Sequence, residues 1–295
     1  MFAFNKFILS FFILIFAEIS FTISTYASDD NSDIKIEKKV INKKIVTLTS
    51  LTADIVSKLN NSYLLGIPGS RLTSKNPALL NKEKVSQGRT PPQLEKIISL
   101  NPDIVIGSAS FHKKQLKKLS SVGIRSEGVE VKNWYGLIDL INKLSVLTDA
   151  DSSLVVNQLD NCILKTNRNN NKVNKKVLIL ASAKPLLAPN SESWAGSLLD
   201  RFGINNSTKM LESKSQFKGY VNLSPEWLIS NQPEKIIIVN TGSNSIQSFI
   251  DLPYWSKLTA VKENKVRYLD YYGLINPGSI DSINKTCLTL SKINN

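Results

Sequence analysis

The sequence predicts an α/β protein with two Rossmann-like lobes, each built on a parallel-type sheet, joined by a long rigid helix and separated by a cleft. Three observations predict this fold class. The ordered region begins with a strand–helix–strand pattern, a helix–proline–strand segment occurs twice, and a long helical pattern lies between the two copies. With 42% apolar residues among 295, the chain is able to bury a substantial core.

The first 27 residues have the features of a cleaved signal peptide. Lys6 precedes an apolar stretch over residues 7–17, and Thr25 and Ala27 place small side chains at the two positions that a signal peptidase recognises. The stretch is shorter than the ~20 residues that span a bilayer, so we expect cleavage rather than a membrane anchor. No cysteine lies near the cleavage region, and we expect the mature protein to be free in the periplasm.

The N-terminal lobe is expected over residues 43–147, after a polar and flexible leader at residues 28–42. Residues 44–48 form an apolar run typical of a buried strand, and residues 51–59 carry apolar side chains at helical spacing. A second strand is expected over residues 63–67. Strand, helix and strand at this spacing predict a parallel sheet covered by helices.

An internal repeat predicts that the second lobe is built like the first. Residues 94–106 and 225–237 match at an offset of 131 positions. Each copy has a glutamate in the first helical turn, at Glu95 and Glu226, where a negative charge suits the helix dipole. A proline then ends each helix before a β-branched strand. The C-terminal lobe is therefore expected over residues 173–295.

The segment between the two copies predicts the connection. An amphipathic helix is expected over residues 134–144, and a helix start at residues 149–152 leads into a second helix that runs to about Lys165. We assign residues 148–172 as the linking helix and a short linker. About 17 helical residues would be roughly 25 Å long, a stiff strut that permits only modest hinge closure.

The second lobe is expected to continue with a strand at 177–182, helices at 194–202 and 254–261, a strand at 266–270 and a closing helix from Ser279. The two cysteines, Cys162 and Cys287, are able to pair in an oxidising compartment or to remain small buried thiols. We favour free thiols, because the sequence does not indicate that the two residues lie close together.

Composition and motifs favour binding over catalysis. The net charge is +13, but the lysines are scattered and aromatic residues do not alternate with them, so we expect no nucleic-acid partner. His112 is the sole histidine and lies in a loop without a nucleophile motif. One histidine argues against capture of a bare transition metal. Residues 66–71 lack a phosphate-binding pattern, and we expect no catalytic site and no cofactor.

Seven short pieces of the mature chain match a known family: 45–50, 88–95, 100–107, 223–226, 255–261, 265–266 and Tyr268. On these segments the mature chain resembles the helix-linked (class III) periplasmic substrate-binding proteins of ABC importers for iron-siderophores, haem and cobalamin. The resemblance implies capture of an iron(III)-siderophore or ferric chelate between the lobes, by a monomer that delivers it to a permease dimer in the inner membrane. It also implies that Glu95 and Glu226 dock onto arginines of the permease.

The resemblance also implies a set of cleft residues. Arg89 matches the arginine that siderophore-binding members place in the cleft, and a guanidinium suits an anionic chelate because it donates to two oxygens at once. Phe111 stands where hydroxamate binders carry a tyrosine, which argues against a hydroxamate cargo. Loops at the carboxyl ends of the strands supply further wall residues: Ser50, Arg71, Ser108, Trp194, Tyr220, Tyr271 and Tyr272.

Three alternatives stay open at this stage. Cobalamin or haem would fit the same fold, with the aromatic residues packing on a corrin or porphyrin. Trp194 opens a helix with buried leucines and is equally suited to the core. A secreted α/β enzyme is the alternative from another class, but it needs a catalytic constellation that the sequence does not contain.

Overall fold

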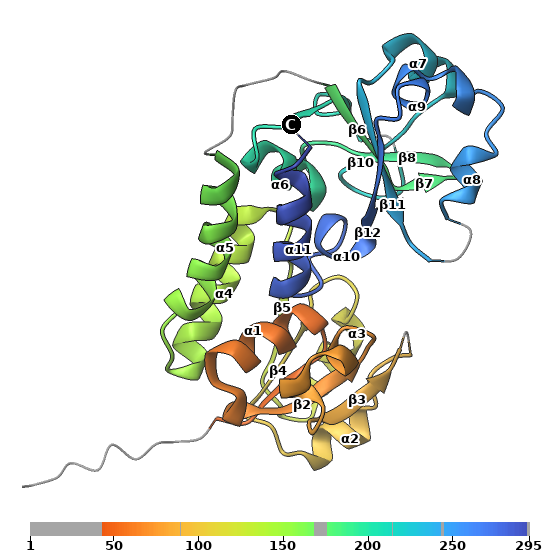
Figure 1. Ribbon diagram of the computed structural model, residues 1–295. Coiled ribbons are helices and arrows are strands. Elements are labelled where there is room, and N and C mark those ends of the chain that lie inside the picture. Colours follow the sequence, from red (N-terminus) through yellow and green to blue (C-terminus); the bar gives the residue numbers. More distant parts are fainter. Residues whose placement is uncertain (1–42, 89, 168–175, 214, 243–244, 294–295) are drawn as a thin grey trace, which may run out of the picture. The chain divides into compact units, whose positions relative to one another are not determined.

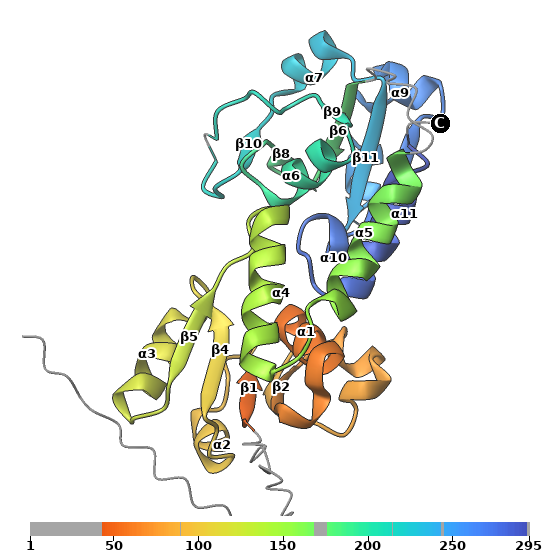
Figure 2. The ribbon, with the colours of Figure 1, turned by 90° about the vertical axis from the view of Figure 1, so that its left-hand side faces the viewer.

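The computed structural model describes residues 43–88, 90–167, 176–213, 215–242 and 245–293, with the backbone alone for residues 161–167. The expected signal peptide, the leader, Arg89 and the end of the linking segment lie outside these residues. Figures 1 and 2 give two views of the chain. No helix in the described ranges is both long enough and apolar enough to cross a membrane.

The first lobe is built on a five-stranded parallel sheet with strand order β3-β2-β1-β4-β5. The central strand β1 is fully buried and pairs with β2 on one side and β4 on the other. The strands are β1 (Ile45–Thr47), β2 (Leu64–Gly69), β3 (Glu83–Gln87), β4 (Ile104–Ser108) and β5 (Ser126–Val129).

Helices cover both faces of this sheet. Helix α1 starts at a Thr49 cap, whose hydroxyl accepts a hydrogen bond from the Thr52 amide, and it buries Ile55 and Val56. Helices α2 and α3 pack with a separate apolar cluster on the other face. The helices are α1 (Ser50–Asn60), α2 (Leu94–Ser99) and α3 (Lys113–Ser121), with short 3₁₀ turns at Asn61–Tyr63, Thr73–Lys75 and Pro77–Leu79.

The second lobe combines a parallel and an antiparallel sheet. Its four-stranded parallel sheet has the order β12-β11-β6-β9, and a three-stranded antiparallel sheet has the order β10-β8-β7. The antiparallel sheet was not expected from the sequence. The strands are β6 (Lys176–Leu180), β7 (Ser182–Ala183), β8 (Leu186–Pro189), β9 (Asn205–Asn206), β10 (Tyr220–Asn222), β11 (Lys235–Asn240) and β12 (Val266–Asp270).

The helices of this lobe follow the expected order, with one correction. The single helix expected over residues 254–261 is two short pieces, because Leu258 between them has extended backbone angles (φ −73°, ψ 132°) and is fully buried. The pieces are η4 (Trp255–Lys257) and α9 (Thr259–Lys262); the other helices are α6 (Trp194–Arg201), α7 (Pro225–Asn231), α8 (Gln247–Ile250), α10 (Tyr271–Leu274) and α11 (Ile280–Leu290).

The predicted repeat is confirmed in backbone detail. Helix α2 and strand β4 correspond to helix α7 and strand β11 at the same offset. Asn101 and Gln232, at equivalent positions, both have left-handed backbone angles, with φ of 46° and 38°, just after the helix. Next to them, Asp103 and Glu234 each exchange two hydrogen bonds with the residue that begins or precedes the central strand.

Two helices connect the lobes, α4 (Trp134–Thr148) and α5 (Ser153–Asn167), whereas the sequence analysis assigned the link to one helix within residues 148–172 and counted the preceding helix with the first lobe. Asp149, with φ 52°, ends the first helix, and the Asp151 carboxylate accepts from the Ser153 amide at the start of the second. Helix α4 contacts α1 of the first lobe and α6 of the second, while α5 packs along α1 and α11. Both helices therefore touch both lobes.

One apolar cluster runs from the first sheet through these connecting helices to the second sheet. It contains residues from α1, α4, α5, α6 and α11 as well as from strands of both lobes. The lobes are thus joined by a shared core on this side of the sheets, and each has a smaller cluster of its own on the opposite side.

The expectation of free thiols is wrong for Cys287. This residue of α11 is fully buried and disulfide-bonded. The sequence contains one other cysteine, Cys162, on the neighbouring helix α5, and its side chain lies outside the described part of the structure.

Candidate functional site

A cavity of about 1460 Å³ lies between the two lobes. Every strand of the first sheet contributes its carboxyl end to the cavity wall, as expected for ligand sites in open α/β sheets. The second lobe contributes the loop that follows β11 and the start of α10, which follows β12. The wall segments include 48–52, 70–71, Gly88, Thr90, Ser108, 110–112, 129–131, 240–242, 270–272 and 276–278.

Most of the predicted cleft residues lie in this wall: Ser50, Arg71, Ser108, Phe111, Tyr271 and Tyr272. Arg89 lies outside the described residues, but Gly88 and Thr90, its neighbours in the chain, both line the cavity. Trp194 and Tyr220 are absent from the described lining.

Trp194 belongs to the core. Its side chain is 4% exposed, its ring stacks on that of Trp134, and its Nε1–H donates a hydrogen bond to the Gly273 carbonyl at 2.9 Å. Both the face of the ring and its N–H group therefore contact other groups inside the protein. The expected role as a cleft wall is wrong for this residue.

Tyr220 lies on β10, where it pairs with Pro189 of β8. Burial raises the pKa of its hydroxyl well above the usual value, and the neighbouring Tyr271 raises it further. The hydroxyl thus stays protonated beside Tyr271, which does line the cavity. Tyr220 is a neighbour of the wall rather than part of it.

The floor of the cavity in the first lobe is a chain of hydroxyl groups. The Ser50 and Ser70 hydroxyls share a hydrogen bond of 2.8 Å, and Ser70 also contacts the Thr73 hydroxyl at 3.2 Å. Thr73 in turn donates to the Pro68 carbonyl at 2.7 Å. These bonds order the loop after β2 and leave Arg71 exposed in the cavity wall, with no ion pair inside the described residues.

A hydrogen-bonded turn holds Phe111 in the cavity wall. The Ser108 hydroxyl accepts from the Phe111 amide at 3.1 Å, and the Ser110 hydroxyl donates to the Glu130 carboxylate at 3.0 Å. The Phe111 side chain is 71% exposed. A large apolar ring held in this position offers a packing surface to a ligand.

His112 is a wall residue that sequence reasoning missed. It is 6% exposed, and its Nδ1 accepts a hydrogen bond from the Ser108 amide at 3.0 Å, which leaves the proton on Nε2. Burial lowers the pKa of this imidazole below its usual range. Its place in the loop directly after β4, beside Phe111, was the signal in the sequence.

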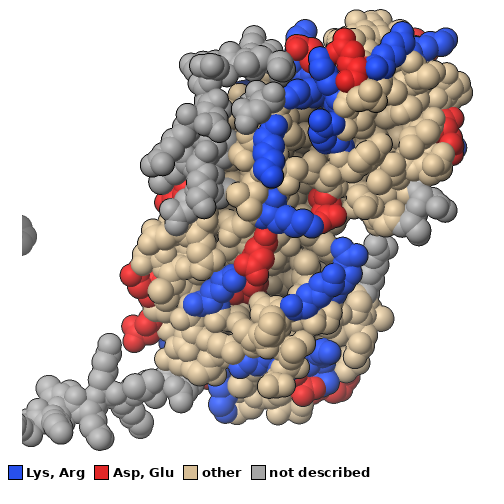
Figure 3. Space-filling model, in the orientation of Figure 1, with Lys and Arg blue, Asp and Glu red and all other residues tan. Residues whose placement is uncertain are grey.

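The described cavity wall combines the Arg71 guanidinium and the N-termini of two helices with two carboxylates, Glu130 and Asp270. Helices α1 and α3 both begin at this wall, and neither has an acidic residue in its first turn, so two positive helix ends face the cavity. Of the acidic wall residues, Asp270 pairs with Lys285 at 2.7 Å. Lysine and arginine are also more widespread than acidic residues on the face seen in Figure 3.

Glu95 and Glu226 lie away from the cavity, each exposed in the first turn of its helix, α2 or α7. Hydrogen bonds from its own backbone amide and from the Ser224 hydroxyl lower the pKa of Glu226. No three His, Cys, Asp or Glu side chains come together as a metal site within the described ranges.

Comparisons with known proteins agree with this geometry. Residues 45–272 match the family model described as periplasmic binding protein. The chain is 28% identical over 189 residues to the Fe(3+)-citrate-binding protein YfmC of Bacillus subtilis, a match that covers 60% of this chain but only 56% of the relative.

Two solved structures show the same fold. An ABC transporter substrate-binding protein from Listeria monocytogenes superposes with a TM-score of 0.69 at 22% identity, covering 85% of this chain and 98% of that one. The periplasmic haem-binding protein HutB of Vibrio cholerae gives 0.69 at 18% identity, with the same coverage. The chain therefore belongs to the periplasmic binding protein family, whose members bind substrates for transport and are not enzymes.

Proposed function

We propose that this protein captures an anionic ferric chelate, such as ferric citrate or an iron(III)-siderophore, between its lobes and delivers it to the permease of an ABC importer. The observation that carries the proposal is the exposed Arg71 guanidinium, which has no ion-pair partner among the described residues, in a cavity lined by hydroxyl groups and by two helix N-termini. A guanidinium donates to two carboxylate or catecholate oxygens at once. Arg89, between two wall residues, would add a second such group.

The size of the cavity and the ligand for which one relative is named support this substrate class. About 1460 Å³ exceeds the roughly 300–1000 Å³ of most small-molecule pockets and leaves room for a bulky chelate. A relative that shares 28% of its aligned residues is a ferric-citrate-binding protein. The missing hydroxyl at Phe111 supports a carboxylate or catecholate cargo over a hydroxamate.

Delivery rests on the two repeated glutamates. Glu95 and Glu226 present one exposed carboxylate on each lobe at equivalent positions of the repeat. Two equivalent carboxylates suit a permease built from two similar halves. We propose that a monomer docks through both, in the periplasm, after removal of residues 1–27. The same proposal takes residues 43–147 and 173–295 as the two lobes and 148–172 as the link.

Haem or cobalamin is the second candidate cargo, because the rings of Phe111, Tyr271 and Tyr272 line the same cavity. Tyr271 and Tyr272 pack edge to face with ring centroids 5.3 Å apart. Such rings would pack on a porphyrin or corrin. The two candidates differ in the forces they use, since a ferric chelate depends on charge and a macrocycle on apolar contact.

A thermal-shift screen separates the candidates. The mature protein is heated with ferric citrate, a ferric hydroxamate, a ferric catecholate, cobalamin or haem, since a ligand at 100 times its Kd stabilises the folded state by about 2.7 kcal/mol. We expect a rise in Tm with ferric citrate or the catecholate. A rise with haem or cobalamin alone would overturn the proposal.

The charge argument is tested by calorimetry with ferric citrate. Arg71→Gln should weaken binding at least tenfold, because the guanidinium contacts the anion in the cavity. Arg125→Gln makes the same change in net charge at an exposed arginine outside the cavity wall and serves as the control. Equal affinities in Arg71→Gln and the wild-type protein would contradict a role for Arg71.

A further inference from the structure

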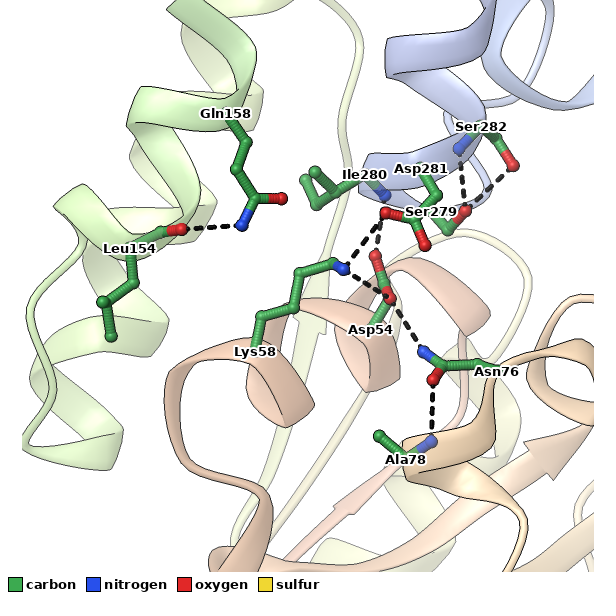
Figure 4. Close-up of polar contacts among 10 residues, drawn as sticks. All are labelled: Asp54, Lys58, Asn76, Ala78, Leu154, Gln158, Ser279, Ile280, Asp281 and Ser282. Atoms are coloured by element: carbon green, nitrogen blue, oxygen red, sulfur yellow. Dashed lines mark hydrogen bonds and ion pairs between the residues drawn. The ribbon is translucent and has the colours of Figure 1, made fainter.

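A buried carboxylate of the first lobe caps the last helix of the second lobe. Asp54, on the inner face of α1, is 2% exposed, and its Oδ2 accepts a hydrogen bond of 2.8 Å from the backbone amide of Ile280. Ile280 is the first residue of α11 and lies 226 positions away in the chain. Figure 4 shows the contact between the two helices.

The remaining bonds of Asp54 hold the carboxylate in this orientation. Its Oδ1 accepts from the Asn76 side-chain amide at 3.1 Å, and the Lys58 ammonium lies 3.8 Å away. Lys58 also bonds to the carboxylate of Asp281, the second residue of α11, at 3.1 Å. Both oxygens of Asp54 are therefore used, one inside its own lobe and one across to the other.

Helix α11 takes its N-terminal caps from two sources. The Ser279 hydroxyl accepts from the Ser282 amide within the helix, while the Ile280 amide depends on Asp54. Such amides need a partner when they are buried. A buried carboxylate is itself unfavourable unless it is well hydrogen-bonded. Burial raises the pKa of Asp54, and Lys58 and the Ile280 amide oppose this rise.

The contact lies directly behind the cleft. Residues 50–52, one turn before Asp54 on α1, line the cavity from the first lobe, and residues 276–278, just before α11, line it from the second. Gly278 has φ 68°, and a Cβ atom there would come within 2.9 Å of the Leu72 side chain of the first lobe. The two lobes are thus closely packed where the wall segment 276–278 meets α11.

We propose that Asp54 is a positioning residue of the cleft: by capping α11 from the opposite lobe, its carboxylate fixes the wall segment 276–278 and the relative setting of the two lobes. The inference rests on the proposed function only in taking the cleft as the binding site. It does not depend on which cargo is bound. Asp54 is not among the residues that line the cavity, so we expect its effect on binding to act through α11.

The first test needs no cargo. Amide hydrogen exchange is measured for residues 276–283 in the wild-type protein, Asp54→Ala, Asp54→Asn and the control Asp281→Asn, which removes the exposed partner of Lys58 but leaves the cap. We expect exchange at Ile280 to rise at least tenfold in Asp54→Ala and less in Asp54→Asn, whose Oδ1 still accepts. Asp281→Asn should stay within twofold of the wild type.

Two results would overturn the proposal. One is unchanged exchange at Ile280 in Asp54→Ala. The other is an equal rise in every segment of the protein, which would mean that Asp54 contributes only to global stability. Should Asp54→Ala fail to fold, Asp54→Asn decides by the same comparison, because it preserves the shape of the side chain.

The second test measures lobe setting and binding. Small-angle scattering should show a different radius of gyration for Asp54→Ala than for Asp281→Asn, and ferric citrate should bind Asp54→Ala at least fivefold more weakly. The proposal would be contradicted if Asp54→Ala and Asp281→Asn had the same radius of gyration and the same affinity for ferric citrate. If the wild-type protein does not bind ferric citrate, that result counts against the proposed function, while exchange and scattering still decide the role of Asp54.

Discussion

Trp134 and Trp194 stack with ring centroids 6.3 Å apart and ring planes within 14° of parallel. Each is the first residue of its helix, α4 or α6, so the pair joins a connecting helix to the second lobe. The Arg201 guanidinium lies over the Trp134 ring, 5.8 Å from its centroid. The pair belongs to the apolar cluster that extends through both lobes.

Trp194→Ala should lower the free energy of unfolding by about 3–5 kcal/mol, the usual cost of removing a buried tryptophan. Trp194→Phe keeps an aromatic ring but leaves the Gly273 carbonyl without its donor, for a loss of about 1–3 kcal/mol. Urea denaturation followed by circular dichroism measures both. If the Trp194→Ala protein has wild-type stability but no longer binds ferric citrate, the assignment of Trp194 to the core is contradicted and its side chain contributes to the cleft.

His112 predicts a dependence of stability on pH. Because its pKa is lowered in the folded protein, the unfolded chain binds a proton first as the pH falls below about 6.5. Stability should therefore decrease from pH 7.5 to pH 5.5, by up to ~1.4 kcal/mol per pH unit for one proton. His112→Asn, which retains an acceptor for the Ser108 amide, should flatten this slope.

The comparison is made between the wild-type protein and His112→Asn in urea at the two pH values. No other histidine contributes, since His112 is the only one in the chain. Carboxylates such as Asp54 titrate in both proteins and cancel in the difference. If the free energy of unfolding changed with pH by the same amount in both proteins, the buried imidazole would accept a proton as readily as an exposed one.

The disulfide of Cys287 predicts that reduction weakens the protein. We expect Cys162, the only other cysteine, to be its partner, which would close a loop of over 100 residues between α5 and α11. In the chain-entropy description, losing such a link costs about 4–5 kcal/mol. Dithiothreitol should lower Tm, and mass spectrometry of the non-reduced digest should find the linked peptides. A free thiol in the unfolded, unreduced protein would contradict this.

Patterns that depend on neighbouring residues were predicted well from the sequence. The apolar runs of β1, β4, β6 and β11 are buried on both faces, so composition alone identifies them. The repeat predicted the correspondence between the lobes, and the structure added the left-handed backbone angles that Asn101 and Gln232 share. The antiparallel strands escaped prediction because they have only two to four residues and no alternating pattern.

Features that depend on distant partners could not be predicted. An aromatic residue at the start of a helix fits the hydrophobic core as well as the wall of a cleft. For Trp194, the stacking on Trp134 identifies the core as its location, and this contact is visible only in the structure. Asp54 is a carboxylate on an apolar helix face, and the sequence around it does not reveal its partner. That partner is the Ile280 amide of α11, which lies near the other end of the chain. His112 lay in the correct loop, but its burial depends on the packing of α3 against the sheet.

The paired glutamates predict a defect in delivery without a defect in capture. Glu95→Ala combined with Glu226→Ala removes one exposed carboxylate from each lobe, and neither side chain lines the cavity. Ferric citrate should bind the double variant with wild-type affinity, because the cleft is untouched. Uptake of iron-55 citrate by cells that carry the variant should fall at least tenfold, because the permease loses both contacts.

The matched control is Asp139→Ala combined with Glu212→Ala, which removes two exposed acidic side chains, one from α4 and one from the second lobe. It changes the net charge by the same amount at positions unrelated to the repeat. If the Glu95 and Glu226 double variant binds ferric citrate normally and supports uptake as fast as the control variant does, the permease recognises another surface. Single variants with half the defect each would mean that the two lobes dock independently.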